Sequence, residues 1–140
     1  MFRRALTVFV VAVLLSYLWE LGQRSLYVGM ADDPKAFWHC FVASLVDGVM
    51  TLTIYGAGCL LFRRSDWLAR ADAGRLGFIL LTGLMVGLAG EWIGLRVLHR
   101  WSYTTAMPLI TSLGLGLVPV LQMMLIPLVV FGLVRALHQS

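Results

Sequence analysis

Charged side chains are scarce in this sequence. Its 140 residues include 11 Lys and Arg and 7 Asp and Glu, so charged residues make up 13% of the chain against 60% hydrophobic residues. Soluble domains carry about a quarter charged residues, and this composition therefore excludes an ordinary water-soluble fold. We expect lipid to be the solvent for most of the protein.

The motifs of several common chemistries are also absent. The sequence contains no nucleotide-binding loop, no G-x-S-x-G or H-E-x-x-H motif and no C-x-x-C pair. Its two cysteines, Cys40 and Cys59, lie in one apolar run, and their separation of 19 positions would hold them about 28 Å apart along a helix. A disulfide between them is therefore excluded, and the spacing does not support dithiol redox chemistry.

Four long apolar runs fill most of the remaining sequence. They cover residues of about 5–27, 37–62, 76–95 and 116–134. A membrane-spanning helix needs about 20 predominantly apolar residues, so the runs predict four transmembrane helices and leave no room for a soluble domain. We expect an all-α four-helix bundle that forms one integral membrane domain over residues 1–140, with any active site built by the bundle itself.

The last apolar run is irregular. The stretch 102–134 is too long for one crossing, and prolines and glycines interrupt it. Because proline favours the first turn of a helix and glycine its end, we predict a short helix or re-entrant segment over residues 104–113, a break around 114–116 and a spanning helix from Val118. The alternative is one long tilted helix with a proline kink.

The distribution of basic residues predicts the orientation. Seven of them fall before the first run, between the second and third runs, or after the last run, whereas the other two loops carry four. Basic residues accumulate on the cytoplasmic side, so we predict cytoplasmic termini and a multi-pass protein of the inner (plasma) membrane. This asymmetry accounts for most of the net charge of +4, and no nucleic-acid partner is expected. The first run lacks a small-residue cleavage site, which favours a retained span over a signal peptide.

Three acidic residues, Glu20, Asp47 and Glu91, lie inside the predicted spans. Carboxyl groups at membrane depth are costly and mark functional sites, so these three are the catalytic candidates. The predicted topology places all of them in the outer half of the membrane. Gly83 and Gly87 share a helix face with Glu91, which predicts that this face packs inward and not against lipid.

Each acid also has a purely structural explanation, as one half of an ion pair or hydrogen bond. Acids and bases four residues apart on a helix can pair, and polar side chains on neighbouring helices can bond across a bundle. The candidate partners are Arg24 for Glu20, Arg96 or Arg100 for Glu91, and Gln122 or Arg24 for Asp47.

Further polar and aromatic residues gather at the predicted outer end and are the substrate-binding candidates. They are Gln23, Arg24, His39, Trp92, Arg96, Trp101, Tyr103 and Gln122. Trp19 adjoins Glu20 and Trp92 adjoins Glu91, so we expect these indoles to form aromatic walls beside the carboxyl groups. The alternative for the aromatic set is the belt of Trp and Tyr found at membrane interfaces.

A metal site is a weaker interpretation of the same region. His39 and His99 fall at the outer end and, with Glu20 and Glu91, would supply imidazole and carboxylate ligands to a divalent metal. No ligand spacing such as H-x-x-x-H is present. We therefore predict neither a metal nor a cofactor.

One local pattern resembles a known family. Residues 90–122, GEWIGLRVLHRWSYTTAMPLITSLGLGLVPVLQ, contain an acid, a later W-x-Y and then a Pro-x-x-Gln that opens a helix. This resembles the small membrane-bound lycopene cyclase domains over about a quarter of the chain. The family pattern has two glutamates where Leu121 and Gln122 stand here. The resemblance implies Glu91, Trp101 and Tyr103 as residues of a substrate pocket.

The leading hypothesis is a small bacterial-type membrane protein with an outer-leaflet pocket for a hydrophobic lipid or isoprenoid. Isomerase- or cyclase-type chemistry would use Glu91 and Asp47 as acid and base, with Glu20 and Arg24 orienting the substrate. Indole rings beside the acids would stabilise a cationic centre.

Two alternatives belong to other functional classes. One is a proton-coupled small-molecule transporter that works as a homodimer and titrates Asp47 or Glu20. The other is a non-catalytic accessory subunit that docks a larger membrane partner through small-residue faces such as Gly83 with Gly87. The transporter predicts polar residues in the cytoplasmic half of the bundle, and the sequence has few there.

Overall fold

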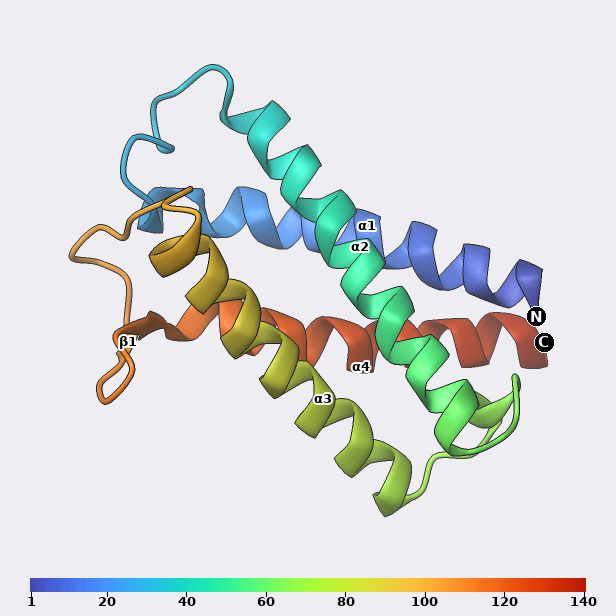
Figure 1. Cartoon of the computed structure of the whole chain (residues 1–140). Coiled ribbons are helices and arrows are strands. Elements are labelled where there is room, and N and C mark those ends of the chain that lie inside the picture. The colour runs from blue at the N-terminus through green and yellow to red at the C-terminus, as the bar shows by residue number, and fades with distance from the viewer.

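The computed structural model describes residues 1–140 and contains four long helices (Figure 1). They are α1 (Phe2–Gln23), α2 (Ala36–Leu61), α3 (Ala73–Trp92) and α4 (Leu117–Gln139). Each is long and apolar enough to cross a membrane, so the chain is a multi-pass helical membrane protein. The prediction of an all-α four-helix bundle is confirmed, and each of the four helices overlaps one of the predicted spans.

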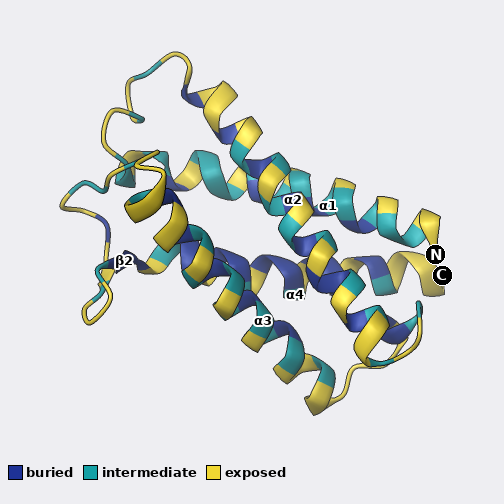
Figure 2. Cartoon of the chain, viewed as in Figure 1, coloured by how far each residue is buried: buried dark blue, intermediate teal, exposed yellow.

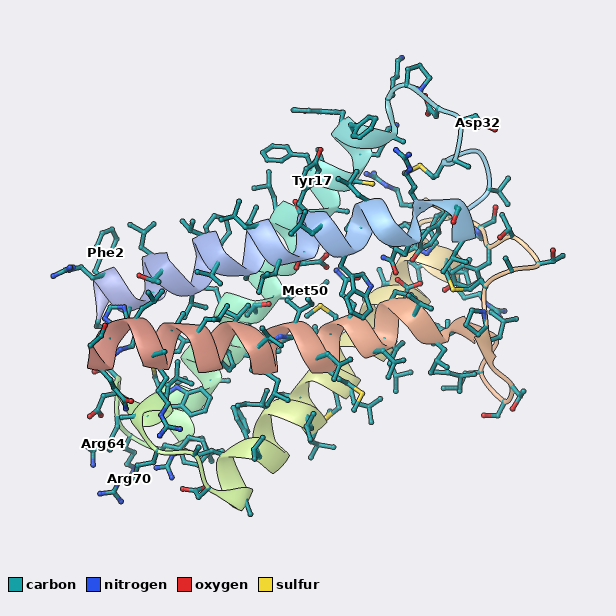
Figure 3. The ribbon with its side chains drawn as sticks, turned by 180° about the vertical axis from the view of Figure 1, so that it is seen from behind. Phe2, Tyr17, Asp32, Met50, Arg64 and Arg70 are labelled. Carbon is teal, nitrogen blue, oxygen red and sulfur yellow. The ribbon has the colours of Figure 1, made fainter.

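The helices form two crossed layers (Figure 1). Helices α1 and α4 lie side by side with the two termini adjacent, and α2 and α3 cross in front of them in Figure 1 and behind them in Figure 3. Helix α1 packs along α2 and α4, and α3 packs on α4, whereas α2 and α3 scarcely touch each other. Buried residues lie on all four helices, most of them on α2 and α4, and the outer faces are exposed, as Figure 2 shows.

Glycines allow α3 to lie close to α4. A Cβ atom at Gly87 would stand 3.2 Å from the Cβ of Met123 and from the Cα of Val120, and at Gly83 it would collide with the Met123 carbonyl group. The predicted inward direction of this glycine face is thus confirmed. The close approach brings Glu91, one turn beyond Gly87, up to the first turns of α4.

The end of the bundle near the termini is closed by the loop between α2 and α3. A 3₁₀ turn, η2 (Trp67–Ala69), inserts the Trp67 side chain among aromatic rings, where it is 1% exposed. The Trp67 indole donates to the Tyr55 carbonyl oxygen over 3.1 Å. Tyr55 and Arg4 both donate to the Ser65 carbonyl oxygen, which ties the loop to α1 and α2. This half of the bundle is a packed apolar core.

Of the two predictions for residues 104–113, a short helix or a re-entrant segment, the helix is wrong. These residues form no helix; β1 (Leu109–Ile110) pairs antiparallel with β2 (Leu115–Gly116) in a small hairpin. Gly114 supplies the left-handed backbone conformation of the turn, with φ of 65°. The hairpin ends directly at the start of α4, so the alternative of one long kinked helix is also wrong. A break at 114–116 is present, but as a strand turn.

The two loops at the opposite end are joined by backbone hydrogen bonds. Val28 donates to the Ser102 carbonyl oxygen over 3.0 Å, and Thr104 donates to the Leu26 carbonyl oxygen over 2.8 Å. Tyr27 stands opposite Tyr103 in the resulting bridge. This connection holds the end of α1 against the segment that follows α3, beside the three acids.

Candidate functional site

A cavity of about 560 Å³ lies at the joined end of the bundle. All four helices contribute to its wall, which combines apolar and polar side chains. Its polar lining consists of Glu20, His39, Asp47, Glu91, Arg100 and Gln122. Much of its apolar wall comes from Val46, Met50, Val86, Met123, Trp38 and Trp101. The size is that of a small-molecule site, with a few polar groups in mainly apolar surroundings.

Gln122 of α4 connects two of the acids. Its amide nitrogen donates to Asp47 Oδ2 over 2.8 Å and to Glu20 Oε1 over 3.2 Å. The side chain is 2% exposed, so these bonds are shielded from solvent. Helices α1, α2 and α4 thus meet at one amide group, and two carboxyl groups from different helices share a single donor.

The orientation of that amide is determined by a chain of hydrogen bonds that starts at Trp19. An indole nitrogen can only donate, and the Trp19 indole donates to Gln23 Oε1 over 3.2 Å. Gln23 must then present its nitrogen to Gln122, and it donates to Gln122 Oε1 over 3.2 Å. The Gln122 nitrogen is consequently the end that faces Glu20 and Asp47. A Trp–Gln–Gln relay therefore directs donors at the carboxyl pair.

Glu91 has different partners. Its Oε2 accepts from the Tyr103 hydroxyl over 2.5 Å and from the Trp101 indole over 3.3 Å. Burial, followed by this hydrogen bond, raises the pKa of Tyr103, so the phenol stays protonated and keeps donating at neutral pH. Glu91 is 8% exposed, and its Oε1 has no partner in the chain.

The π-helical turn η3 (Ile93–Val97), which follows α3, gives Trp101 its place. The Arg100 amide donates back to the Gly94 carbonyl oxygen over 2.8 Å. A Cβ atom at Gly94 would overlap the Trp101 ring, so only glycine allows the indole to fold back beneath the helix. Wide turns of this kind are frequent at functional sites.

None of the three acids forms an ion pair. The salt bridges of the chain join Arg64 to Asp66 and Arg75 to Asp72, in the loop at the other end. The predicted structural pairing of Glu20 with Arg24 is wrong, because the Arg24 guanidinium lies over the Phe37 ring at 5.0 Å. The predicted pairing of Glu91 with Arg96 or Arg100 is also wrong.

The hydrogen bond predicted between Asp47 and Gln122 is present. It leaves Asp47 without a basic partner, because the alternative partner, Arg24, is turned away.

The structure brings most of the predicted site residues together. Glu20, Asp47, Glu91, His39, Trp101 and Gln122 line the cavity. Gln23 and Tyr103 lie behind them and hold Gln122 and Glu91. Three candidates stand outside the lining: Arg24, Trp92 and Arg96.

The aromatic side chains beside the acids are not the ones expected from the sequence. Trp92 does not face Glu91 from the next position, because its side chain is 54% exposed and points away from the cavity. Trp101, ten residues further on, takes that place. Trp19 donates to Gln23 and does not line the cavity. Adjacent positions on a helix point in different directions, which is why direct sequence neighbours of the acids were poor candidates.

Several lining residues had no signal in the sequence. Met30, Met50 and Met123 contribute to the cavity, and Trp38 stands at its side. Methionines in apolar runs look the same whether they face lipid, core or a pocket.

The residues suggested for a metal do not converge. No three His, Cys, Asp or Glu side chains form a group that could hold a metal ion. His39 lines the cavity at an exposed position, whereas His99 lies outside the lining, in the loop after α3 with φ of 50°.

No family model, curated protein or solved structure matches this chain. The class of protein therefore rests on the fold and the site. It is a small multi-pass helical membrane protein with an internal pocket lined by three carboxyl groups that have no ionic partner.

Proposed function

We propose that the protein binds a hydrophobic lipid or isoprenoid in this cavity and acts on it by acid–base chemistry of the isomerase or cyclase type. One observation carries the proposal: three intramembrane carboxyl groups without ionic partners line one cavity with apolar walls. Such groups are expensive in a membrane and are characteristic of sites that transfer protons or bind ligands. The packed core at the other end needs no such groups.

Glu91 is suited to the role of proton donor. Because Oε2 receives two hydrogen bonds, the proton of the neutral carboxyl group resides on Oε1, the atom without a partner. Asp47 would take a proton from a neighbouring carbon of the substrate, with its charge supported by the Gln122 amide. In such a step one carbon of a double bond gains a proton, a carbon next to the resulting cationic centre loses one, and the double bond re-forms there. No oxidant or reductant is needed.

The resemblance to lycopene cyclase domains supports the same assignment. It implies a pocket role for Glu91, Trp101 and Tyr103, and these three side chains form one hydrogen-bonded cluster. The Trp101 ring would stabilise a cationic centre that forms on protonation. The two glutamates of the family pattern are absent here, which leaves the acid role to Glu91.

We propose the outer leaflet of the inner membrane for the cavity. The end of the bundle that holds it is the one with four basic residues, and the closed end with both termini has seven. The positive-inside rule then places the closed end in the cytoplasm.

The substrate would reach the site directly from the lipid, between α2 and α3. These two helices scarcely touch, and Trp38, Val42 and Val46 of α2 both line the cavity and face outward. Across the gap, a Cβ atom at Gly90 would meet the Met50 methyl group at 3.4 Å, an ordinary contact distance. Gly90 therefore stands at the edge of a lateral opening.

Replacing Gly90 with leucine is expected to block this opening. The Met50 methyl group is the end of a flexible side chain and no backbone atom lies near the added Cβ, so we expect the fold to be retained. The amount of ligand that the purified protein retains should fall about tenfold or more, because the path from the lipid is closed. Mass spectrometry of the purified protein measures it. Gly77→Leu is the matched control, because Gly77 is on the same helix with nothing within 4 Å. Equal ligand in both variants would contradict lateral access.

The alternative functions receive less support from the geometry. A transporter needs a polar route through both halves of the bundle, and the half around Trp67 is packed with apolar side chains. An accessory subunit that docks through Gly83 and Gly87 would need that face free, and α4 already covers it. The same cover removes the glycine faces as a reason for a homodimer.

Native mass spectrometry with lipid extraction tests the proposed function. The wild-type protein in mild detergent should retain a hydrophobic molecule, and Glu91→Gln and Asp47→Asn should retain it unconverted or lose it. Asp32→Asn, at an exposed loop position, removes a carboxylate outside the cavity and should behave as wild type. An empty wild-type protein, or one that carries a stoichiometric partner protein, would contradict the proposal.

A further inference from the structure

The hydrogen-bond donors in the deep part of the cavity are already in use. The amide nitrogen of Gln122 has two hydrogens, and both are directed at carboxyl oxygens of Glu20 and Asp47. The single donors of Trp101 and Tyr103 are directed at Glu91. The relay from Trp19 prevents Gln122 from turning, since its oxygen is held by Gln23.

Acceptors, in contrast, are left over. Glu20 Oε2 and Asp47 Oδ1 accept no hydrogen bond from an amide, indole or hydroxyl group of the chain. The Tyr27 hydroxyl also lines the cavity, but one hydroxyl can donate to only one of these atoms. The cavity therefore has an excess of acceptors that a bound molecule must satisfy.

The charged groups of the lining favour the same kind of ligand group, one that donates hydrogen bonds and carries a positive charge. Three carboxyl groups face the cavity, and its two basic lining residues, His39 and Arg100, have exposed side chains at the rim and form no ion pair. The remaining basic residues nearby are turned away: Arg24 lies over Phe37, and Arg96 is outside the lining. A positive group on the ligand would compensate these acids, with which the basic residues of the chain form no ion pair.

Aromatic rings complete the surroundings of such a group. Trp38, Trp101 and Tyr27 line the same cavity, and Tyr27 stands edge to face against Trp101 at 6.3 Å between ring centres. Ring faces attract cations, and an ammonium group beside indole and carboxylate is held by both.

We propose that the ligand of this cavity is an amphiphile whose polar group donates hydrogen bonds to Asp47 and Glu20, with a protonated amine as the preferred form of that group. This inference rests on the proposed function, whose hydrophobic substrate it narrows to one with a donating head. The hydrocarbon part lies along Val46, Met50 and Val86, on the side that opens between α2 and α3.

A series of four probes with the same tail tests the proposal. Dodecylamine, 1-dodecanol, dodecyl methyl ether and dodecanoate differ in charge and in donors but share a twelve-carbon chain. Binding is measured by equilibrium dialysis against wild-type protein in phosphatidylcholine nanodiscs, with uptake by empty nanodiscs subtracted. The amine should bind about tenfold or more tightly than the ether, with the alcohol between them and dodecanoate weakest, because a hydrogen bond to a charged group exceeds a neutral one.

The carboxyl variants locate the head group. Asp47→Asn should weaken amine binding about tenfold or more and leave ether binding within about twofold, whereas the exposed Asp32→Asn should change neither. Equal affinity of wild type for amine and ether, or tighter binding of dodecanoate, would overturn the inference. The wild-type series decides this even where a variant does not fold. Binding of all tails without preference would leave the proposed pocket intact, and binding of none would contradict the pocket itself.

Discussion

Replacement of Trp67 by alanine is expected to destabilise the protein more than any other single truncation. The indole is 1% exposed, stacks with Phe62 at 5.3 Å between ring centres, and packs edge to face against Phe78 and Phe131. Removing a buried tryptophan leaves a large cavity and costs about 3–5 kcal/mol. The hydrogen bond to the Tyr55 carbonyl oxygen is lost with it. Equilibrium unfolding in mild detergent measures the change.

Trp92→Ala is the matched control for this experiment. Its indole is 54% exposed and makes no hydrogen bond in the chain, so its loss should change the free energy of unfolding by no more than about 0.5 kcal/mol. Similar destabilisation by both substitutions would contradict the role of Trp67 as the closing side chain of the bundle. The α2–α3 loop would then contribute no more than an exposed position does.

Replacement of Gln122 by leucine is expected to disrupt the site and the fold together. Leucine has nearly the same size, so the cost is polar: Asp47 and Glu20 lose their donor, and the Gln23 amide loses its acceptor. Each buried polar group left without a partner costs about 1–3 kcal/mol, so the three together destabilise the protein by about 3 kcal/mol or more. Thermal unfolding in detergent, with parallel measurement of retained ligand, should show a lower Tm and loss of the ligand.

Gln139→Leu is the matched control, because it makes the same substitution outside the site. Gln139 is on the same helix but exposed at its end, where its amide donates to the Ala69 carbonyl oxygen over 3.3 Å. Its loss should cost about 1 kcal/mol or less. A Gln122→Leu protein as stable as wild type would show that the carboxyl groups do not depend on this amide, and the relay from Trp19 would have no role in positioning them.

The bundle is built asymmetrically. Its closed half is held by a loop tryptophan and an apolar core, and its other half is hollow and holds the buried acids. Stability contributed by the closed half permits a cavity with poorly compensated polar groups at the other end. The two large predicted effects therefore probe different halves, and their free-energy changes should add, since Trp67 and Gln122 share no partner.

The sequence by itself determined the four spans and the presence of acids at one end of the bundle. Hydropathy and helical periodicity are local properties, so residues of about 5–27 or 37–62 predict a helix without knowledge of its neighbours. Alternating helix direction then brings Glu20, Asp47 and Glu91 to the same side. The inward direction of Gly83 and Gly87 could also be predicted from the sequence, because it depends on the spacing of small residues along one helix.

Only the tertiary structure decided which groups meet. Arg24 is one turn from Glu20 yet lies over Phe37, and the partner of Glu20 is Gln122, 102 residues away in sequence. Helix crossing angles and the donor-only chemistry of Trp19 select that partner, and neither is encoded in local spacing. The hairpin before α4 likewise depends on a left-handed Gly114 and strand pairing. Long-range contacts made this site, because side chains bond to whatever the packed helices bring within reach.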